Sequence, residues 1–129
     1  MVQVVVGVIS NLNKEILVTQ RPTQKSYSGY WEFPGGKKEL NETSYQTLVR
    51  ELKEELDIEV LSAEAWKRLE YEYPEKIIEL NIWIVTKFRR DPQGMENQAF
   101  QWVSLDKLAE IDFLPANKMV LTEIIQLMR

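Results

Sequence analysis

Residues 36–58 read GKKELNETSYQTLVRELKEELDI. Gly36 opens this stretch, Glu42 follows after an interval of five residues, and after seven more comes the run Arg50-Glu51-Leu52-Lys53-Glu54-Glu55. Glycine, glutamate and arginine at such fixed intervals are not expected by chance in a chain of ordinary composition. The spacing therefore indicates a functional motif.

The second half of this stretch has the pattern of an amphipathic helix from Thr43 to Leu56. Thr43 and Gln46 have the spacing of a capping box. At about 100° per residue, Leu48, Val49, Leu52 and Leu56 form an apolar stripe. Beside the stripe, at the rim of the face expected to be buried, lie Glu51, Glu54 and Glu55.

These three glutamates have two interpretations. Three acidic residues alone would be read as a solvated helix face. Like charges grouped at the rim of a buried face repel one another unless a divalent cation binds among them. The full spaced pattern favours metal ligation.

The amino-acid composition limits which catalytic and metal-binding groups the chain can contain. The 129-residue chain has no Cys and no His, which excludes disulfides, zinc-thiolate sites, Cys nucleophiles and Ser-His relays. Any metal must be held by oxygen, which selects Mg²⁺ or Mn²⁺, and the proton acceptor must be a carboxylate, a Lys or a Tyr. A net charge of −4 and a pI of about 5.0 argue against a nucleic-acid-binding surface.

The first ten residues carry no sign of export or membrane insertion. Met1–Ser10 is apolar, but it lacks a basic leader and is too short to span a bilayer. We therefore expect a cytoplasmic protein without membrane contact.

The alternation of apolar and polar residues predicts a mixed α/β architecture. A single domain of residues 1–129 is expected, with a mixed sheet and helices on both faces. Strands are predicted at Val2–Ile9, Glu15–Thr19, Trp31–Phe33, Arg68–Tyr73, Ile77–Phe88 and Gln101–Val103. Loops are predicted at Arg21–Tyr30, Arg89–Asn97 and Leu114–Asn117. Beyond the helix at Thr43–Leu56, Ser104 is expected to cap a short helix through Glu110. A last helix is expected to turn Met119, Val120, Ile124, Leu127 and Met128 to the core.

The stretch resembles the Nudix box, the signature of Mg-dependent hydrolases of nucleoside diphosphates linked to another moiety. Residues 35–58 match it except at Asp57, where the family usually has Gly. That position follows the helix end, where a left-handed backbone is common. Asp accepts this conformation at a cost of about 1 kcal/mol. The resemblance implies the α/β/α sandwich of the family.

The resemblance also implies a ligand set for Mg²⁺, for which Mn²⁺ would substitute. The expected ligands are the Gly36 carbonyl and the carboxylates of Glu51, Glu54, Glu55 and Glu96. Either Glu51 or Glu96 would be the general base. Alone, Glu96 would be read as a surface residue.

Glu42 and Arg50 have a different expected role. We expect them to brace the loop against the helix through a charge-assisted pair.

The resemblance to the MutT branch of the family extends over nearly the whole chain. It includes Phe33-Pro34-Gly35-Gly36-Lys37, Leu69-Glu70-Tyr71-Glu72-Tyr73-Pro74 and Pro115-Ala116-Asn117. Enzymes of this branch convert 8-oxo-dGTP to 8-oxo-dGMP and pyrophosphate, with water attacking the β-phosphorus. The resemblance implies the same activity here, in cleansing the nucleotide pool.

By this resemblance, Asn117 reads the oxidised base. A carboxamide offers a donor and an acceptor, while 8-oxoguanine presents N7–H as donor and O6 as acceptor. Guanine has acceptors at both positions and would leave the Asn carbonyl unpaired. The alternative is that Asn117 caps the last helix. Arg21 and Phe33 are expected to contact the nucleoside, and Lys37 either contacts phosphate or is a solvated surface residue.

Two other functions remain open at this stage. One is a broader nucleoside triphosphate or dihydroneopterin triphosphate pyrophosphohydrolase. The other is a non-catalytic nucleotide-sensing domain, although a pure binder has no need of three glutamates. The expected partner is a small nucleotide, with the protein a monomer.

Overall fold

A computed structural model describes residues 1–23 and 25–129. Its larger sheet has four strands in the order β4 (Gly35–Lys37), β1 (Val2–Ile9), β6 (Ile77–Arg89) and β5 (Glu59–Glu72). β1 pairs in parallel with β6 and antiparallel with β4, and β5 pairs antiparallel with β6. The sheet is therefore mixed, as predicted.

The remaining strands form a second sheet of three, which the sequence did not distinguish from the first. Its order is β3 (Trp31–Glu32), β2 (Glu15–Gln20) and β7 (Phe100–Ser104), all antiparallel. Segments far apart in the chain are thus brought together, because β7 lies against β2.

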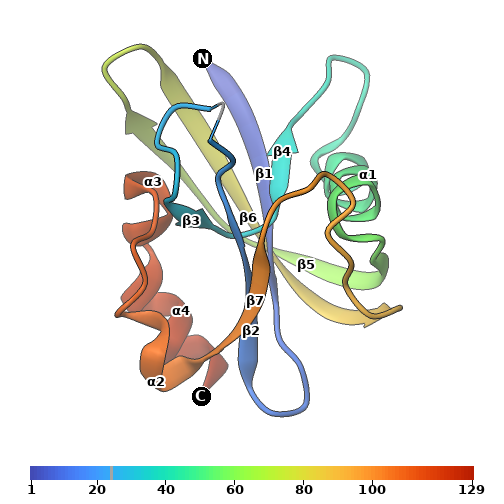
Figure 1. Ribbon diagram of the computed structural model, residues 1–129. Coiled ribbons are helices and arrows are strands. Elements are labelled where there is room, and N and C mark those ends of the chain that lie inside the picture. The colour runs from blue at the N-terminus through green and yellow to red at the C-terminus, as the bar shows by residue number, and fades with distance from the viewer. Residues whose placement is uncertain (24) are drawn as a thin grey trace.

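Helices cover the strands on both sides (Figure 1). α1 (Ser44–Leu56) lies on one side, and the other side carries α2 (Leu105–Leu108), α3 (Pro115–Lys118) and α4 (Leu121–Met128). The α/β/α layering implied by the sequence is confirmed. No helix in residues 1–23 or 25–129 is long and apolar enough to cross a bilayer.

The alternating side chains of β1 contribute to two hydrophobic cores. Val5 and Ile9 pack with the apolar stripe of α1. Val6 and Val8 pack with the core beneath the C-terminal helices. Because successive strand residues point to opposite faces, one apolar strand joins both layers.

α1 begins and ends as the local sequence predicts. Thr43 is the N-cap, and its reciprocal hydrogen bonds with Gln46 form the capping box. Asp57 ends the helix with φ 56° and ψ 31°, in the left-handed region. Asp57 thus adopts the left-handed conformation expected of the usual Gly, and Arg90 Nη2 donates to its Oδ2 at 2.6 Å.

The first half of β5 was missed by the sequence prediction. This strand begins at Glu59, not at Arg68. Its pairing with β6 shifts register between Val60 and Lys67, and these irregularities interrupt the regular alternation that indicates a strand.

The C-terminal prediction was wrong in two respects. Pro115–Lys118, placed partly in a loop, forms α3, and α4 begins only at Leu121. Val120 and Ile124 are buried and Met128 is partly buried against the same core, as predicted. Met119, at the end of α3, and Leu127 are exposed.

Candidate active site

β4 runs so close to its neighbours that its glycines have no room for side chains. A Cβ on Gly35, whose φ is +154°, would lie 2.0 Å from the Val5 carbonyl oxygen. A Cβ on Gly36 would lie 2.4 Å from Cδ of Glu51. Only glycine permits so close an approach. The peptide at Gly36 therefore lies directly against the Glu51 carboxyl group.

Arg50 links residues that precede α1 with glutamates on α1 itself. Its Nε and Nη2 donate to the two Glu42 oxygens at 2.6 and 2.9 Å, and Nη2 also donates to the Lys37 carbonyl at 3.1 Å. Its Nη1 donates to Glu51 Oε1 at 2.9 Å and to Glu54 Oε2 at 3.4 Å. The predicted Glu42–Arg50 brace is present, and it includes the carboxylates themselves.

We expect the stabilities of the wild type and Glu42→Gln to converge as the pH falls. The Arg50 hydrogen bond lowers the pKa of Glu42 from 4.5 to about 2. Because the folded-state pKa lies below the unfolded value, the pair stabilises the fold fully above pH 4.5 and loses this contribution as pH falls towards 2. Urea unfolding of both proteins between about pH 7 and about pH 3 measures the difference.

Glu39→Gln is the matched control for this series. The Glu39 carboxylate is exposed and lies 3.9 Å from Arg50, so its removal should produce no comparable pH dependence. A wild-type advantage over Glu42→Gln that stays constant at every pH would contradict the expected linkage.

Glu55 is the buried member of the acidic group. It is 7% exposed, its Oε2 accepts from the Gly35 N–H at 3.0 Å and its Oε1 from Gln98 Nε2 at 3.0 Å. Burial raises its pKa to about 8 against the effect of both hydrogen bonds, and the charges of Glu32 and Glu51 add to the rise. A bound cation would favour the ionised carboxylate.

In the part of the chain that the structure describes, the carboxylates of the other acidic residues near Glu55 do not converge on one point. Glu54 is exposed on α1, and Glu96 is exposed on the segment between β6 and β7. Burial raises the pKa of Glu51, opposed by Arg50 and reinforced by the charges of Glu54 and Glu96. Within residues 1–23 and 25–129, no three acidic side chains converge closely enough to hold an ion in this conformation.

The donor set nevertheless fits a hard divalent cation. All donors are oxygens, excess negative charge gathers around a buried carboxylate, and a Cβ at Gly36 would fill the space beside Glu51. Arg50 occupies one oxygen of Glu51 and one of Glu54. The ligand roles of Gly36, Glu51, Glu54, Glu55 and Glu96 therefore stay predictions.

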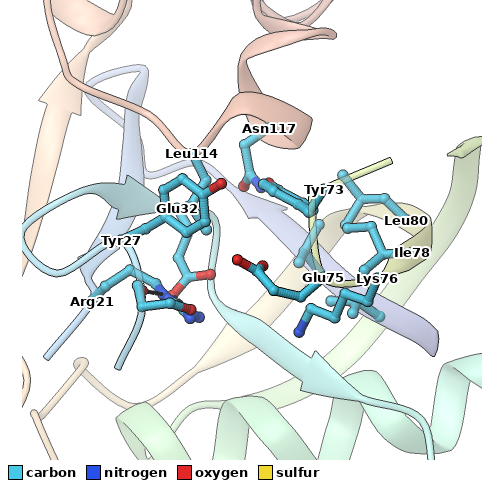
Figure 2. Close-up of a pocket in the computed structure, with 13 residues that line it drawn as sticks. Arg21, Tyr27, Glu32, Tyr73, Glu75, Lys76, Ile78, Leu80, Leu114 and Asn117 are labelled. Atoms are coloured by element: carbon cyan, nitrogen blue, oxygen red, sulfur yellow. Dashed lines mark hydrogen bonds and ion pairs between the residues drawn. The ribbon is translucent and has the colours of Figure 1, made fainter. Parts of the chain in front are cut away.

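A pocket opens beside β1, between the loop after β2 and the β5–β6 turn. Figure 2 shows Asn117 reaching into it from α3, with Arg21 and Glu32 on one side and the turn residues Glu75 and Lys76 on the other. The pocket has both apolar and polar lining, as sites for small molecules commonly do.

Asn117 is 3% exposed, and its Oδ1 accepts a hydrogen bond from the Phe33 N–H at 2.9 Å. The helix-cap alternative is wrong, because the N-cap of α4 is Val120 and no side chain caps that helix. The Phe33 N–H orients the carboxamide, since an oxygen must face this donor.

The other predicted substrate contacts lie in different settings. Arg21 lines the pocket, 3.6 Å from the Glu32 carboxylate. The Phe33 side chain is 1% exposed and packs on Phe113 in the core, with ring centroids 5.1 Å apart. It does not line the pocket, and its backbone is the part that touches Asn117. Lys37 is exposed on β4, and its phosphate contact stays a prediction.

Sequence reasoning missed several residues of the pocket. Glu32 lines it, and burial raises the pKa of this carboxyl although Arg21 opposes the shift. Tyr27 and Tyr73 also line it, with ring centroids 5.3 Å apart, and the Tyr73 hydroxyl accepts from the Ala116 N–H at 3.1 Å. Strand alternation offered one signal, because Glu32 must face away from the buried Phe33.

Comparison with known proteins identifies the family of the chain. The NUDIX domain family model matches residues 5–123. An 8-oxo-dGTP diphosphatase of Escherichia coli K12 is 41% identical over 122 residues, covering 95% of each chain. A CTP pyrophosphohydrolase of the same organism is 40% identical over 117 residues, 91% of this chain and 86% of the relative.

Solved structures give the same result. A MutT structure from work on Aliivibrio salmonicida and Vibrio cholerae aligns with a TM-score of 0.87 and 36% identity over 98% of both chains. The E. coli ORF135 protein aligns with a TM-score of 0.85 and 38% identity, over 98% of this chain and 90% of that one. The chain therefore belongs to the NUDIX domain family, as the resemblance of residues 36–58 predicted.

Proposed function

We propose that the protein is a Mg²⁺-dependent pyrophosphohydrolase that converts 8-oxo-dGTP to 8-oxo-dGMP and pyrophosphate. The buried Asn117 carboxamide is the observation that supports this substrate. It lines the pocket, and the Phe33 N–H orients it. The similarity of the chain to an 8-oxo-dGTP diphosphatase supports the same reaction.

Asn117 matches the edge that distinguishes the oxidised base. Its Nδ2 is the donor for O6, while its Oδ1 retains a second lone pair, beyond the one used by Phe33, to accept from N7–H. Guanine presents no hydrogen at N7 and would leave this oxygen facing another acceptor. Asn117 therefore favours the oxidised base over guanine.

One short segment links the pocket with the carboxylates, because the Phe33 N–H donates to Asn117 and the Gly35 N–H, two residues later, donates to Glu55. Glu32, directly before Phe33, lines the pocket. With the base beside Asn117, the triphosphate extends from Arg21 towards α1. We assign Glu51 Oε2 to accept the proton of the water that attacks the β-phosphorus, since Oε1 is held by Arg50. A bound Mg²⁺ would supply neutralisation of phosphate charge and a lower pKa for water.

Asn117→Ala and Asn117→Asp test the base-reading role. A bidentate contact to a base is worth about 1–3 kcal/mol, or roughly 5- to 150-fold in discrimination. Both variants should lower kcat/KM for 8-oxo-dGTP by this order and leave dGTP hydrolysis little changed. Steady-state kinetics with both nucleotides measures the ratio.

The two variants differ in stability, which separates recognition from packing. Asn117→Ala leaves the buried Phe33 N–H unpaired, at a cost of about 1–3 kcal/mol. Asn117→Asp keeps an oxygen for that N–H but has no amide donor. Near wild-type preference for 8-oxo-dGTP in Asn117→Asp would mean that Asn117 only supports the fold.

A broader nucleoside triphosphate activity is the second candidate, because the identity to the CTP pyrophosphohydrolase is almost equal. Pyrophosphate release from 8-oxo-dGTP, dGTP, CTP and dihydroneopterin triphosphate separates these functions. The highest kcat/KM should belong to 8-oxo-dGTP. A maximum at CTP would replace the proposal, and nucleotide binding without release would indicate a sensing domain.

The remaining features of the proposal concern the cellular setting. Hydrolysis of an oxidised precursor protects DNA replication and belongs to the cytoplasm. Residues 1–129 act as one Nudix hydrolase domain, and the enzyme works as a monomer without binding nucleic acid or membrane. Acidic composition supports the absence of nucleic-acid binding.

A further inference from the structure

The segment that carries Glu96 is hydrogen-bonded to the last turn of α1. The Gln93 N–H donates to the Leu56 carbonyl at 2.8 Å, and the Met95 N–H donates to the Glu55 carbonyl at 2.9 Å. The last carbonyls of a helix have no partner within the helix. Here a separate segment supplies two of the missing donors, and Glu96 follows directly after the second.

Gln98 adds a side-chain contact to the same turn. Its Nε2 donates to Glu55 Oε1 at 3.0 Å, while the Gly35 N–H donates to Oε2 at 3.0 Å from the opposite element. The Glu55 carboxylate is therefore held at both oxygens. Because Glu55 is 7% exposed, these bonds determine the direction of its remaining lone pairs.

We propose that Gln98 is a positioning residue of the metal site, which orients the Glu55 carboxylate. This inference rests on the proposed metal-dependent function. Gln98 does not itself touch metal or substrate in this proposal.

The chemistry of the side chain suits this role. A carboxamide orients a carboxylate by hydrogen bonding without adding positive charge that would compete with a cation. Arg50 acts differently on Glu51 and Glu54, because its guanidinium brings a positive charge to their carboxylates. Gln98 keeps its contact through metal binding. Hydrogen-bond partners of this kind orient metal ligands and maintain the affinity of the site for metal.

The backbone contacts at Gln93 and Met95 already dock the segment on α1. Removing only the Gln98 amide should therefore leave the segment docked and affect the carboxylate. A variant without this amide therefore tests the orientation of Glu55 separately from the docking of the segment. Gln98→Met keeps the length and approximate volume of the side chain but has no N–H donor.

The experiment measures Mn²⁺ binding to the nucleotide-free protein by isothermal titration. Outer partners of metal ligands typically contribute 10- to 100-fold in affinity, so Gln98→Met should bind Mn²⁺ about 10- to 100-fold more weakly. Gln101→Met is the matched control, because Gln101 is exposed on β7; it should change affinity by no more than about twofold. Glu54→Gln removes an expected metal ligand and should therefore lose Mn²⁺ binding.

Two further readouts distinguish positioning from a general structural defect. The Mn²⁺ concentration for half-maximal hydrolysis should rise in Gln98→Met, while KM for nucleotide at saturating Mn²⁺ stays near the wild-type value. The melting temperature in EDTA should match that of Gln101→Met. Gln98→Asn, one methylene shorter but with the amide retained, should recover part of the lost affinity and provides the measurement if the Met variant does not fold.

The outcomes separate the inference from the proposed function. Wild-type Mn²⁺ affinity in Gln98→Met, together with loss of binding in Glu54→Gln, would overturn the positioning role and leave the hydrolase intact. Equal defects in Gln98→Met and Gln98→Asn with lowered melting temperatures would assign Gln98 to folding alone. Absence of Mn²⁺ binding by the wild type would overturn the metal-dependent function and this inference with it.

Discussion

Glu54→Gln is expected to lose at least ~10³-fold in turnover while folding normally, because electrostatic stabilisation of a transition state by bound metal is worth several kcal/mol. Glu54 is exposed on α1, where its carboxylate contacts Arg50. Little packing depends on it, so its removal affects charge at the site. Steady-state pyrophosphate release and thermal unfolding of the same variant measure both effects.

Metal removal should have the same consequence in the wild type. EDTA is expected to abolish hydrolysis, and Mg²⁺ or Mn²⁺ should restore it, because the chain has neither Cys nor His to hold a softer metal. Glu64→Gln provides the control, since Glu64 is exposed on β5. Full activity in EDTA, or a Glu54→Gln enzyme as active as Glu64→Gln, would contradict the assignment of the site.

Glu51→Gln is expected to reduce kcat by about 10²- to 10⁴-fold, the usual contribution of a general base. Gly36 lies against the Glu51 carboxyl group, and Arg50 holds its Oε1. Glu51 does not line the pocket proposed to hold the nucleobase, so KM should change much less than kcat. Kinetics with 8-oxo-dGTP at saturating Mg²⁺ measures the two constants separately.

Glu96→Gln decides which carboxylate is the base. Glu96 lies on the segment docked against α1, and its charge adds to the raised pKa of Glu51. If Glu51 takes the proton, the loss in kcat is larger in Glu51→Gln. A larger loss in Glu96→Gln would transfer the role to Glu96.

The helix that carries the motif was predictable because its determinants are local. Thr43 and Gln46 are three residues apart and cap each other, and the apolar stripe repeats at the helical period. The left-handed turn at Asp57 follows from the helix end in the same way. These interactions operate within one turn of the chain and therefore leave a readable pattern.

The strands were predictable only where alternation was regular. β1 was predicted with its observed bounds, Val2–Ile9. The first half of β5 was not, because its irregular register is accommodated by pairing with β6. Likewise, the division of the strands into two sheets depends on which edges meet, and no single segment encodes this.

The sequence by itself determined the family, the capped helix with its three carboxylates and the restriction of any metal ligands to oxygen, because each depends on residue type and short spacing. Only the tertiary structure decided how these groups are held. Asn117 and Phe33 meet across 84 residues, and Gln98 meets Glu55 across 43. Burial sets the pKa of Glu55 and Glu32, and burial depends on the packing of distant segments that local patterns do not record.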